Sequence, residues 1–363
     1  MTLVHHDGVL LTSTQGIMGQ WAEYFEDFFN PTSMSSSEKA ELGDLGPGSP
    51  ISGAEAENAS NVATKSRFIS DFEVIARLGK GGFGSVYEVK QKLLDKHFAV
   101  KIVRFRDFRE ARKEVEVLSD LHHPNIVRYF ECWVDSEYQD EYRVSSSSSE
   151  SKSGASKQYL YIMLELCEPV NLGGRIKDMN KEGLEGFGRR RQILPIAQEI
   201  VSGVEYFHFK KLIHRDLKPS NIMFGKDGKV KIGDFGLVTT DTSDDDENQM
   251  DRTEGAGTKP YMAPEQKSRK YDRKVDMFAL GLIFFELLWK ISTVTVTEKS
   301  KIWTDLRSRK FPEEFVGTFY QEYKIIKSLL SENPEDRQEA AVLQAELKGL
   351  ISRDSEDQEN RTV

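Results

Sequence analysis

The sequence predicts an α+β fold in two lobes, the first rich in antiparallel strands and the second helical. From about residue 68, short runs alternate between apolar and polar residues or stay apolar, with many Val, Ile, Phe and Tyr, as strands do. From about residue 190, apolar residues recur at helical spacing instead. The chain has 363 residues, 38% of them hydrophobic, which is enough for one large or two small cores. Strands followed by helices are the order expected of an α+β protein.

Five strands and one helix are expected in the first lobe. The strands are "FEVIARLG", "GSVYEVKQ", "HFAVKIVRF", "NIVRYFECWV" and "YLYIMLELC". A helical pattern at 107–120 separates the third strand from the fourth. In the second lobe, helices are expected at 192–210, 275–290, 301–309, 319–331 and 337–351.

Three segments flank or interrupt this folded region. Residues 1–66 are expected to be a mostly disordered N-terminal segment, because 31–66 are rich in Ser, Gly, Ala, Glu and Asn. Within it, 17–29 carry aromatic residues on one helical face, which predicts a short amphipathic helix that either packs on its own domain or docks a partner. Residues 135–158 form a low-complexity insert, and 352–363 are expected to be a disordered tail.

Composition weighs against several classes of protein. The formal net charge of −9 argues against broad nucleic-acid binding, though not against a local basic groove. The two cysteines, Cys132 and Cys167, make neither a disulfide framework nor a zinc motif, so a reducing, cytoplasmic location is expected. The longest apolar run, at 278–289, contains Glu286 and is too short to cross a bilayer, so no membrane partner is expected.

A glycine-rich stretch opens the folded region. "LGKGGFGSV" places Gly79, Gly81 and Gly84 in the pattern G-x-G-x-x-G-x-V, which ends at Val86. Glycines let the backbone approach a phosphate closely. A dinucleotide site would need a helix next, but a strand follows, so the choice is between a phosphate-covering hairpin and a plain glycine-rich one.

The strand "HFAVKIVRF" carries Lys101 among apolar residues, where a charge is costly unless it is paired. The helix expected at 107–120 offers a partner, since Glu114 borders its apolar face. An ion pair with Glu114 would hold Lys101 toward a phosphate. Glu110 and Glu116 on the same helix are alternative partners.

Four polar residues that suit phosphoryl transfer follow in "IHRDLKPSN" and "VKIGDFGLV". Asp216 lies on a loop, where it can accept a hydrogen bond from an incoming hydroxyl. Lys218 can neutralise charge on a transferred phosphoryl group. Asn221 and Asp234 supply oxygens to a divalent metal, and Mg²⁺ prefers few carboxylates together with phosphate oxygens. Phosphoryl transfer depends on such positioning and charge neutralisation.

These motifs, together with "MAPE" at 262–265, resemble the signatures of protein kinases. The resemblance covers residues 68–351 and implies a bilobal kinase fold that uses ATP and Mg²⁺. It implies ATP binding for Gly79, Gly81, Gly84, Val86, Lys101, Glu114, Glu165 and Cys167, metal binding for Asn221 and Asp234, and catalysis for Asp216 and Lys218.

The same resemblance implies structural roles for three residues. Glu265 is expected to pair with Arg337, and Asp276 to hold the catalytic loop. Lys218 after "HRDL", together with "GT" at 257–258, matches the serine/threonine pattern rather than the tyrosine pattern.

Further features are similar to the kinases of the alpha subunit of eukaryotic initiation factor 2. They are the insert at 135–158, Gln266 directly after A-P-E, "KIWTDLR" at 301–307, and "SRFISDFEVI" with "IVRYFECW" in the first lobe. The resemblance implies that this subunit is the protein substrate and that Thr304 lies on the surface that docks it.

The resemblance also implies how activity is controlled. Thr253 would be the main activation-loop phosphorylation site, with Thr258 secondary, and a phosphate on Thr253 could pair with Arg215. Three further residues would form a homodimer through the first lobe, with an Arg–Asp pair between chains and a Tyr bonded to the Asp. They are Arg67, Asp71 and Tyr129.

One feature of that family has no counterpart in the sequence. A member carries RNA-binding domains ahead of the kinase, whereas residues 1–66 show no basic aromatic patch, so no nucleic-acid partner is expected for this chain. A longer parent protein and a form without a sensor both fit this difference. Two other functions stay open, a pseudokinase that only binds partners and a serine/threonine kinase with another substrate.

Overall fold

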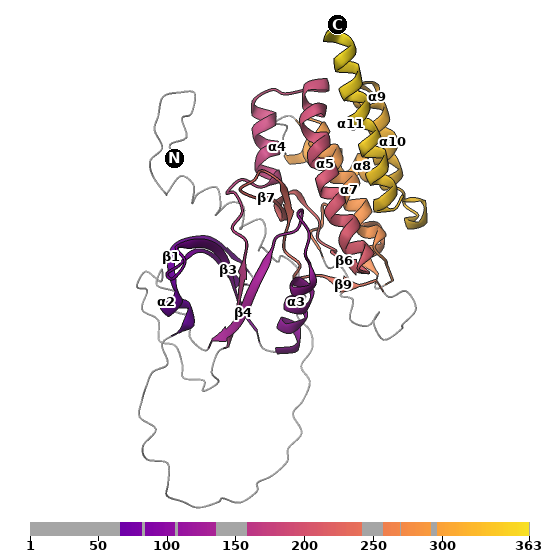
Figure 1. Cartoon of the computed structure of the whole chain (residues 1–363). Helices are drawn as coiled ribbons and strands as arrows, with labels where there is room; N and C mark the ends of the chain where they lie inside the picture. Colours follow the sequence, from indigo (N-terminus) through magenta and orange to yellow (C-terminus); the bar gives the residue numbers. More distant parts are fainter. Residues whose placement is uncertain are drawn as a thin grey trace, which may run out of the picture.

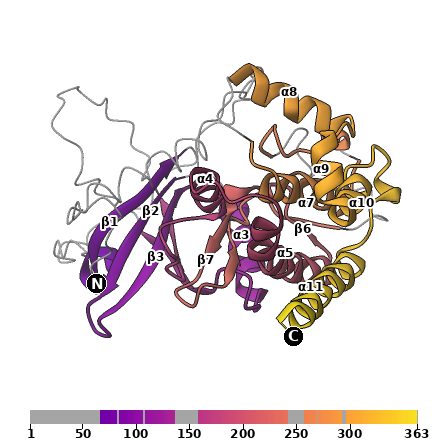
Figure 2. The same ribbon diagram turned by 90° about the horizontal axis from the view of Figure 1, so that it is seen from above.

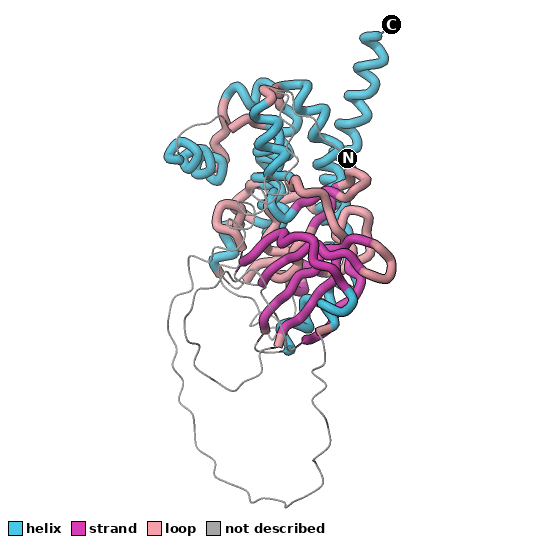
Figure 3. The backbone as a smooth tube through the Cα atoms, turned by 90° about the vertical axis from the view of Figure 1, so that its left-hand side faces the viewer, coloured by secondary structure: helices cyan, strands magenta, loops and turns pink. Residues whose placement is uncertain are grey.

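The computed structural model describes residues 66–81, 84–105, 108–135, 158–241, 257–268, 270–291 and 296–362. The helix expected at 17–29, most of the insert at 135–158 and Thr253 lie outside these residues. Figure 1 shows the strands of the first lobe on one side and the helices of the second on the other, and the tube in Figure 3 shows the same separation. The predicted α+β architecture with two lobes is confirmed.

The first lobe is a five-stranded antiparallel sheet in the order β1-β2-β3-β5-β4. Its strands are β1 (Phe72–Gly81), β2 (Gly84–Gln91), β3 (Lys96–Arg104), β4 (Tyr129–Asp135) and β5 (Tyr159–Leu164). All five were expected from their apolar patterns. Two helices accompany the sheet, the short α2 (Arg67–Asp71) and α3 (Phe108–Asp120).

Aromatic packing attaches α2 to the sheet. Phe68 is buried, with its ring 5.2 Å from that of Tyr161 on β5. Trp133 on β4 stacks against Phe72 at 5.6 Å and against Tyr161 at 5.2 Å. Such ring contacts add to the free energy gained by removing the rings from water. Phe68 therefore anchors the short helix to the core of the first lobe.

The second lobe is built around helices. They are α4 (Leu172–Lys181), α5 (Gly186–Phe209), α7 (Lys274–Leu288), α8 (Val296–Arg307), α9 (Glu313–Thr318), α10 (Tyr320–Leu329) and α11 (Ala340–Thr362). Nearly every residue of α7 is buried, as expected for a helix that is apolar on all sides. In Figure 2, α7 lies among the other helices while α8 lies at the edge of the lobe.

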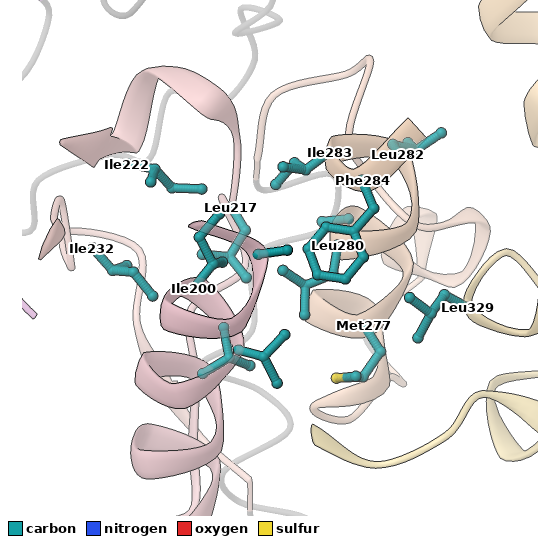
Figure 4. Close-up of a cluster of buried hydrophobic side chains, with 14 of the residues drawn as sticks. Ile200, Leu217, Ile222, Ile232, Met277, Leu280, Leu282, Ile283, Phe284 and Leu329 are labelled. Atoms are coloured by element: carbon teal, nitrogen blue, oxygen red, sulfur yellow. The ribbon is translucent and has the colours of Figure 1, made fainter. Parts of the chain in front are cut away.

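The core of the second lobe reaches the loop that carries the predicted catalytic residues. Figure 4 shows Leu217, from that loop, in the same apolar cluster as Ile200 of α5 and Leu280 of α7. All three side chains are at most 1% exposed. The loop is thus held by the same apolar packing that holds the helices together.

The end of the chain differs from its expected form. Residues 352–363 were expected to be a disordered tail, but α11 continues to Thr362. A contact explains part of the extension, because Asp354 binds the guanidinium of Arg190 on α5. Tertiary contacts supply most of the stability of helices in proteins.

Asn171 caps the first helix of the second lobe, and its loss should be measurable. Its side chain accepts a hydrogen bond from the Gly174 N–H at 2.9 Å at the start of α4. We expect Asn171→Ala to lower the free energy of unfolding by about 1 kcal/mol, the usual cost of removing an N-cap. Urea unfolding measures this, and Asn171→Ser should retain most of the stability because it keeps an acceptor. Equal losses in the two variants would contradict the capping role.

Candidate active site

Two small sheets bring the predicted site residues together. β6 (Leu212–Ile213) pairs with β9 (Thr239–Thr240), and β7 (Ile222–Phe224) pairs with β8 (Val230–Ile232). Residues 214–221 connect β6 to β7, and residues 233–238 connect β8 to β9. Because the strands at both ends of these two connections are paired, the loops must lie side by side.

Asp216 lies at the centre of the first loop and is 8% exposed. Its Oδ1 accepts hydrogen bonds from the backbone N–H and the hydroxyl of Thr258, both at 2.7 Å. Its Oδ2 lies 2.9 Å from Nζ of Lys218, which also donates to the Thr258 hydroxyl at 2.6 Å. The carboxylate is therefore oriented by groups from two separate segments of the chain.

Asn221 joins Asp216 to the second loop. Its Nδ2 donates to the Asp216 carbonyl at 2.9 Å and to Asp216 Oδ2 at 3.2 Å, so its Oδ1 is the atom suited to a cation. Its own carbonyl accepts from the Gly233 N–H at 2.9 Å, directly before Asp234. Asp216, Asn221 and Asp234 therefore lie in one small region, as the spacing of the motifs predicted.

Asp234 forms an ion pair with Lys101 of the first lobe. Nζ of Lys101 lies 3.2 Å from Asp234 Oδ1, which links β3 to the loop after β8. Burial alone would raise the pKa of Asp234, but the charges of Lys101, His214 and Lys218 outweigh it, so the pKa lies below its usual value. Asp234 has a left-handed φ of 56°, a conformation that the surrounding loop must maintain.

The partner expected for Lys101 in the first lobe is Glu114. Glu114 lies on α3, but its side chain is outside the described part of the structure, as is that of Glu110. Glu116, the other alternative, pairs with Arg112 at 2.6 Å on the helix surface. Glu114 as the partner of Lys101 stays a prediction.

The described residues of the glycine-rich stretch lie at the end of β1 and the start of β2. Gly79 is paired with Val86, and Val86 is paired on its other side with Lys101 of β3. The register thus places Val86 between the glycines and the lysine. Gly84 has φ of +146°, and a Cβ there would lie 2.0 Å from the Ile102 carbonyl oxygen, so only glycine fits this close approach.

The segment after β5 connects the two lobes. The Glu165 N–H donates to the Arg128 carbonyl at 2.8 Å, and the Glu165 carboxylate lies 3.0 Å from Nζ of Lys231 on β8. Burial, with the nearby charge of Glu165, raises the pKa of Cys167 to about 12. The thiol is therefore neutral at physiological pH, which suits an apolar wall rather than a reactive group.

Asp276 at the start of α7 anchors the loop of Asp216. Its carboxylate accepts from the backbone N–H groups of His214 and Arg215, each at 2.9 Å. A third partner was missed in the sequence, since Nε2 of His208 lies 2.9 Å from Asp276 Oδ2. The position of His208 in the sequence could have indicated this contact, because His208 lies in the last turn of the helix that leads into the loop.

Glu265 and Arg337 form a buried ion pair, as their spacing in the family pattern implied. Arg337 donates to both carboxylate oxygens, one at 3.0 Å, and its side chain is fully buried. The pair connects η2 (Pro264–Lys267) to the segment that follows η3 (Pro334–Asp336).

The structure places Thr258 and Thr304 in different surroundings. Thr258 is bound to Asp216 and Lys218, so its hydroxyl is part of the site itself. Thr304 is exposed on α8 and donates to the Ser300 carbonyl at 2.9 Å. On the same helix, Arg307 binds the Pro260 carbonyl at 2.9 Å, which attaches α8 to the segment before A-P-E.

Two of the three residues expected at a dimer interface, Arg67 and Asp71, contact each other on the first lobe. Arg67 binds Asp71 at 3.3 Å and both oxygens of Glu131 at 2.8 Å, within one chain. Burial, with Cys132 beside it, raises the pKa of Tyr129. The sequence reasoning missed Glu131. An Arg67–Asp71 pair between two chains stays a prediction.

The low pKa of Asp234 predicts a pH dependence of stability. A carboxyl group whose pKa is lowered by folding stabilises the native state fully above its unfolded pKa of about 3.9, and this contribution is lost as the pH falls through the folded value. We expect the wild-type chain to lose more stability than Asp234→Asn between about pH 5 and pH 2. Urea unfolding across this range measures the difference. Asp227→Asn, at an exposed turn, should follow the wild type; equal curves for wild type and Asp234→Asn would contradict the prediction.

The fold and the site define a protein kinase. The chain belongs to the protein kinase domain family, whose match spans residues 72–346. Members of this family transfer a phosphoryl group from ATP with the help of Mg²⁺.

Among curated proteins, the chain is similar to several protein kinases, two of which are named as kinases of initiation factor 2-alpha. It is 39% identical over 276 residues to the mouse interferon-induced, double-stranded RNA-activated protein kinase, a match that covers 76% of this chain and 50% of that protein. It is 42% identical over 207 residues to cattle eukaryotic translation initiation factor 2-alpha kinase 3, covering 54% and 18%. It is 32% identical over 319 residues to the Arabidopsis thaliana eIF-2-alpha kinase GCN2, covering 77% and 25%. The chain thus spans half or less of the length of these relatives.

The donor set of the site fits Mg²⁺. Asn221 offers an amide oxygen and Asp234 a carboxylate held in its ionised form. In the described residues, no cluster of three or more His, Cys, Asp or Glu side chains is suited to a metal. Mg²⁺ needs no such cluster, because it takes one or two protein ligands and completes its shell with phosphate oxygens and water. In the same part of the chain, no helix is both long and apolar enough to span a membrane.

Proposed function

We propose that the chain is an ATP- and Mg²⁺-dependent serine/threonine protein kinase that phosphorylates the alpha subunit of eukaryotic initiation factor 2. The catalytic part of this proposal rests on the arrangement of side chains around Asp216. Lys218 and Thr258 fix both oxygens of this carboxylate, and Asn221 joins it to the loop of Asp234. The carboxylate is therefore preorganised to receive a proton.

Each residue has a distinct task in this reaction. Asp216 orients the acceptor hydroxyl and takes its proton, and Lys218 offsets the charge that develops on the transferred group. Lys101 reaches from the first lobe to hold phosphate oxygens. Asn221 and Asp234 would hold Mg²⁺, which would supply neutralisation of the phosphate charge.

The assignment of serine/threonine specificity rests on the contact between Lys218 and Thr258. Their 2.6 Å hydrogen bond joins two groups that both contact the Asp216 carboxylate. The "HRDLK" and "GT" segments that bear these residues match the serine/threonine pattern.

The substrate assignment rests on two observations. Relatives over the kinase region are named as kinases of initiation factor 2 alpha. Thr304 is exposed on α8, and Arg307 three residues later ties this helix to the segment before A-P-E. A folded substrate bound to α8 would therefore lie close to the catalytic loop.

The proposal has a direct test. Purified chain should transfer labelled phosphate from ATP to the alpha subunit. Thr304→Ala should weaken this transfer about tenfold, the effect of about 1.4 kcal/mol of lost docking, while sparing a generic basic protein. Ser308→Ala, exposed at the end of the same helix, should behave as wild type. Equal loss on both substrates would count against docking at Thr304.

We further propose that activity is controlled by phosphorylation of Thr253 and by a homodimer of first lobes through Arg67, Asp71 and Tyr129. In the structure, Arg215 donates to the Leu237 carbonyl and to the Tyr271 hydroxyl. A phosphate on Thr253 would compete for this guanidinium. Mass spectrometry of the autophosphorylated chain tests the first part, and no phosphate at Thr253 would overturn it.

A further inference from the structure

Gln266 is a buried polar residue to which the proposed reaction assigns no role. It follows A-P-E in η2 and is 2% exposed. Its Oε1 accepts from the Ala263 N–H at 2.7 Å, and its Nε2 donates to the Arg215 carbonyl at 3.1 Å. One side chain thus bridges the end of the activation segment and the residue directly before Asp216.

A second part of the activation segment approaches the same carbonyl. Gly257 has φ of +121°, and a Cβ at this position would lie 2.7 Å from the Arg215 oxygen and 3.4 Å from Gln266 Nε2. The stretch 257–268 therefore approaches the Arg215 carbonyl at two points, at Gly257 and at Gln266.

Arg215 needs such support because its backbone is strained. Its φ is +69°, a conformation that costs a non-glycine residue free energy unless its surroundings hold it. Asp276 binds the Arg215 N–H at 2.9 Å, and Gln266 binds the Arg215 carbonyl. The two contacts lie on either side of the strained residue, so the second one orients the peptide that leads into Asp216.

We propose that Gln266 is a positioning residue that sets the orientation of the Arg215–Asp216 peptide, and with it the carboxylate of Asp216. The proposal rests on the proposed catalytic role of Asp216. Gln266 makes this orientation depend on the placement of η2 and Ala263, so the end of the activation segment must be in position before Asp216 is. A displacement of a reacting group by about 1 Å can lower a rate by about 10²-fold.

The test uses Gln266→Met, which keeps the length of the side chain and removes both hydrogen bonds. We expect kcat to fall by about 10- to 100-fold while KM for ATP and the affinity for a fluorescent ATP analogue change less than about twofold. Gly257→Ala would place a methyl group against the same carbonyl, next to Gln266 Nε2, and should show the same signature. Because both act on one group, the double variant should lose much less than the product of the two single losses.

Controls separate this proposal from the proposed function. Lys267→Met, at the exposed neighbouring position, should retain wild-type kcat. Asp216→Asn tests the catalytic role itself, and full activity in that variant would refute the proposed function whatever Gln266 does. With Asp216→Asn inactive, any of three results overturns the positioning role: wild-type kcat in Gln266→Met, joint loss of kcat, nucleotide affinity and melting temperature, or multiplicative losses in the double variant.

Discussion

Asp216→Asn is expected to lower kcat by about 10²- to 10⁴-fold, the range supplied by a positioned general base. The amide keeps the shape of the side chain and can still contact Lys218 or Thr258, but it cannot take the proton of an acceptor hydroxyl. Binding of ATP should change little, because the proposed function assigns nucleotide binding to Lys101 on β3 and to Asp234 on the other loop, which pair with each other.

Labelled phosphate transfer to a protein acceptor measures this effect, with nucleotide affinity measured in parallel. Asp178→Asn is the matched control, since Asp178 is exposed on α4 and distant in sequence from the site. Activity within threefold of wild type in Asp216→Asn would show that the carboxylate is not the base, and would favour a chain that binds partners without this chemistry.

Arg337→Met is expected to lower the free energy of unfolding by about 3–5 kcal/mol, the cost of breaking a buried ion pair from one side. Arg337 is fully buried and binds Glu265, whose side chain is only 15% exposed. It also donates to the Ser331 carbonyl at 2.9 Å and to the Lys274 carbonyl at 3.0 Å. Methionine fills much of the volume but leaves a buried carboxylate and two carbonyls without these donors.

Urea unfolding gives the magnitude, and a surface pair gives the comparison. Arg112→Met breaks the exposed pair with Glu116 on α3, which should cost no more than about 0.5 kcal/mol. A cost for Arg337→Met as small as that of the surface variant would mean that the Glu265 carboxylate finds another partner or becomes protonated.

Much of the fold was predictable because it is local in origin. The five strands of the first lobe each carry an apolar pattern that only an extended chain can bury on a sheet. The long apolar stretch of α7 was recognised as a buried helix for the same reason. By contrast, α4 begins with Leu172 followed by two glycines, a pattern too weak to predict a helix from spacing alone.

The proximity of several predicted site residues also followed from the sequence, but their contacts did not. Asp216, Lys218 and Asn221 lie within one short motif, so their proximity follows from the chain itself. The bond between Thr258 and Asp216 joins segments 42 residues apart. The His208 contact with Asp276 and the Glu131 contact with Arg67 likewise depend on how separate elements pack.

The sequence by itself therefore determined the two-lobed class of this protein and the chemical groups available for phosphoryl transfer, since periodicity and motif spacing are properties of neighbouring residues. Only the tertiary structure decided which atom each group meets. It directed Lys101 to Asp234, held the strained Arg215 between Asp276 and Gln266, and extended α11 to Thr362. Such contacts arise because buried polar atoms need hydrogen-bond partners, and apolar packing decides which elements lie close enough to provide them. The pattern of neighbouring residues in the sequence does not predict which partner that will be.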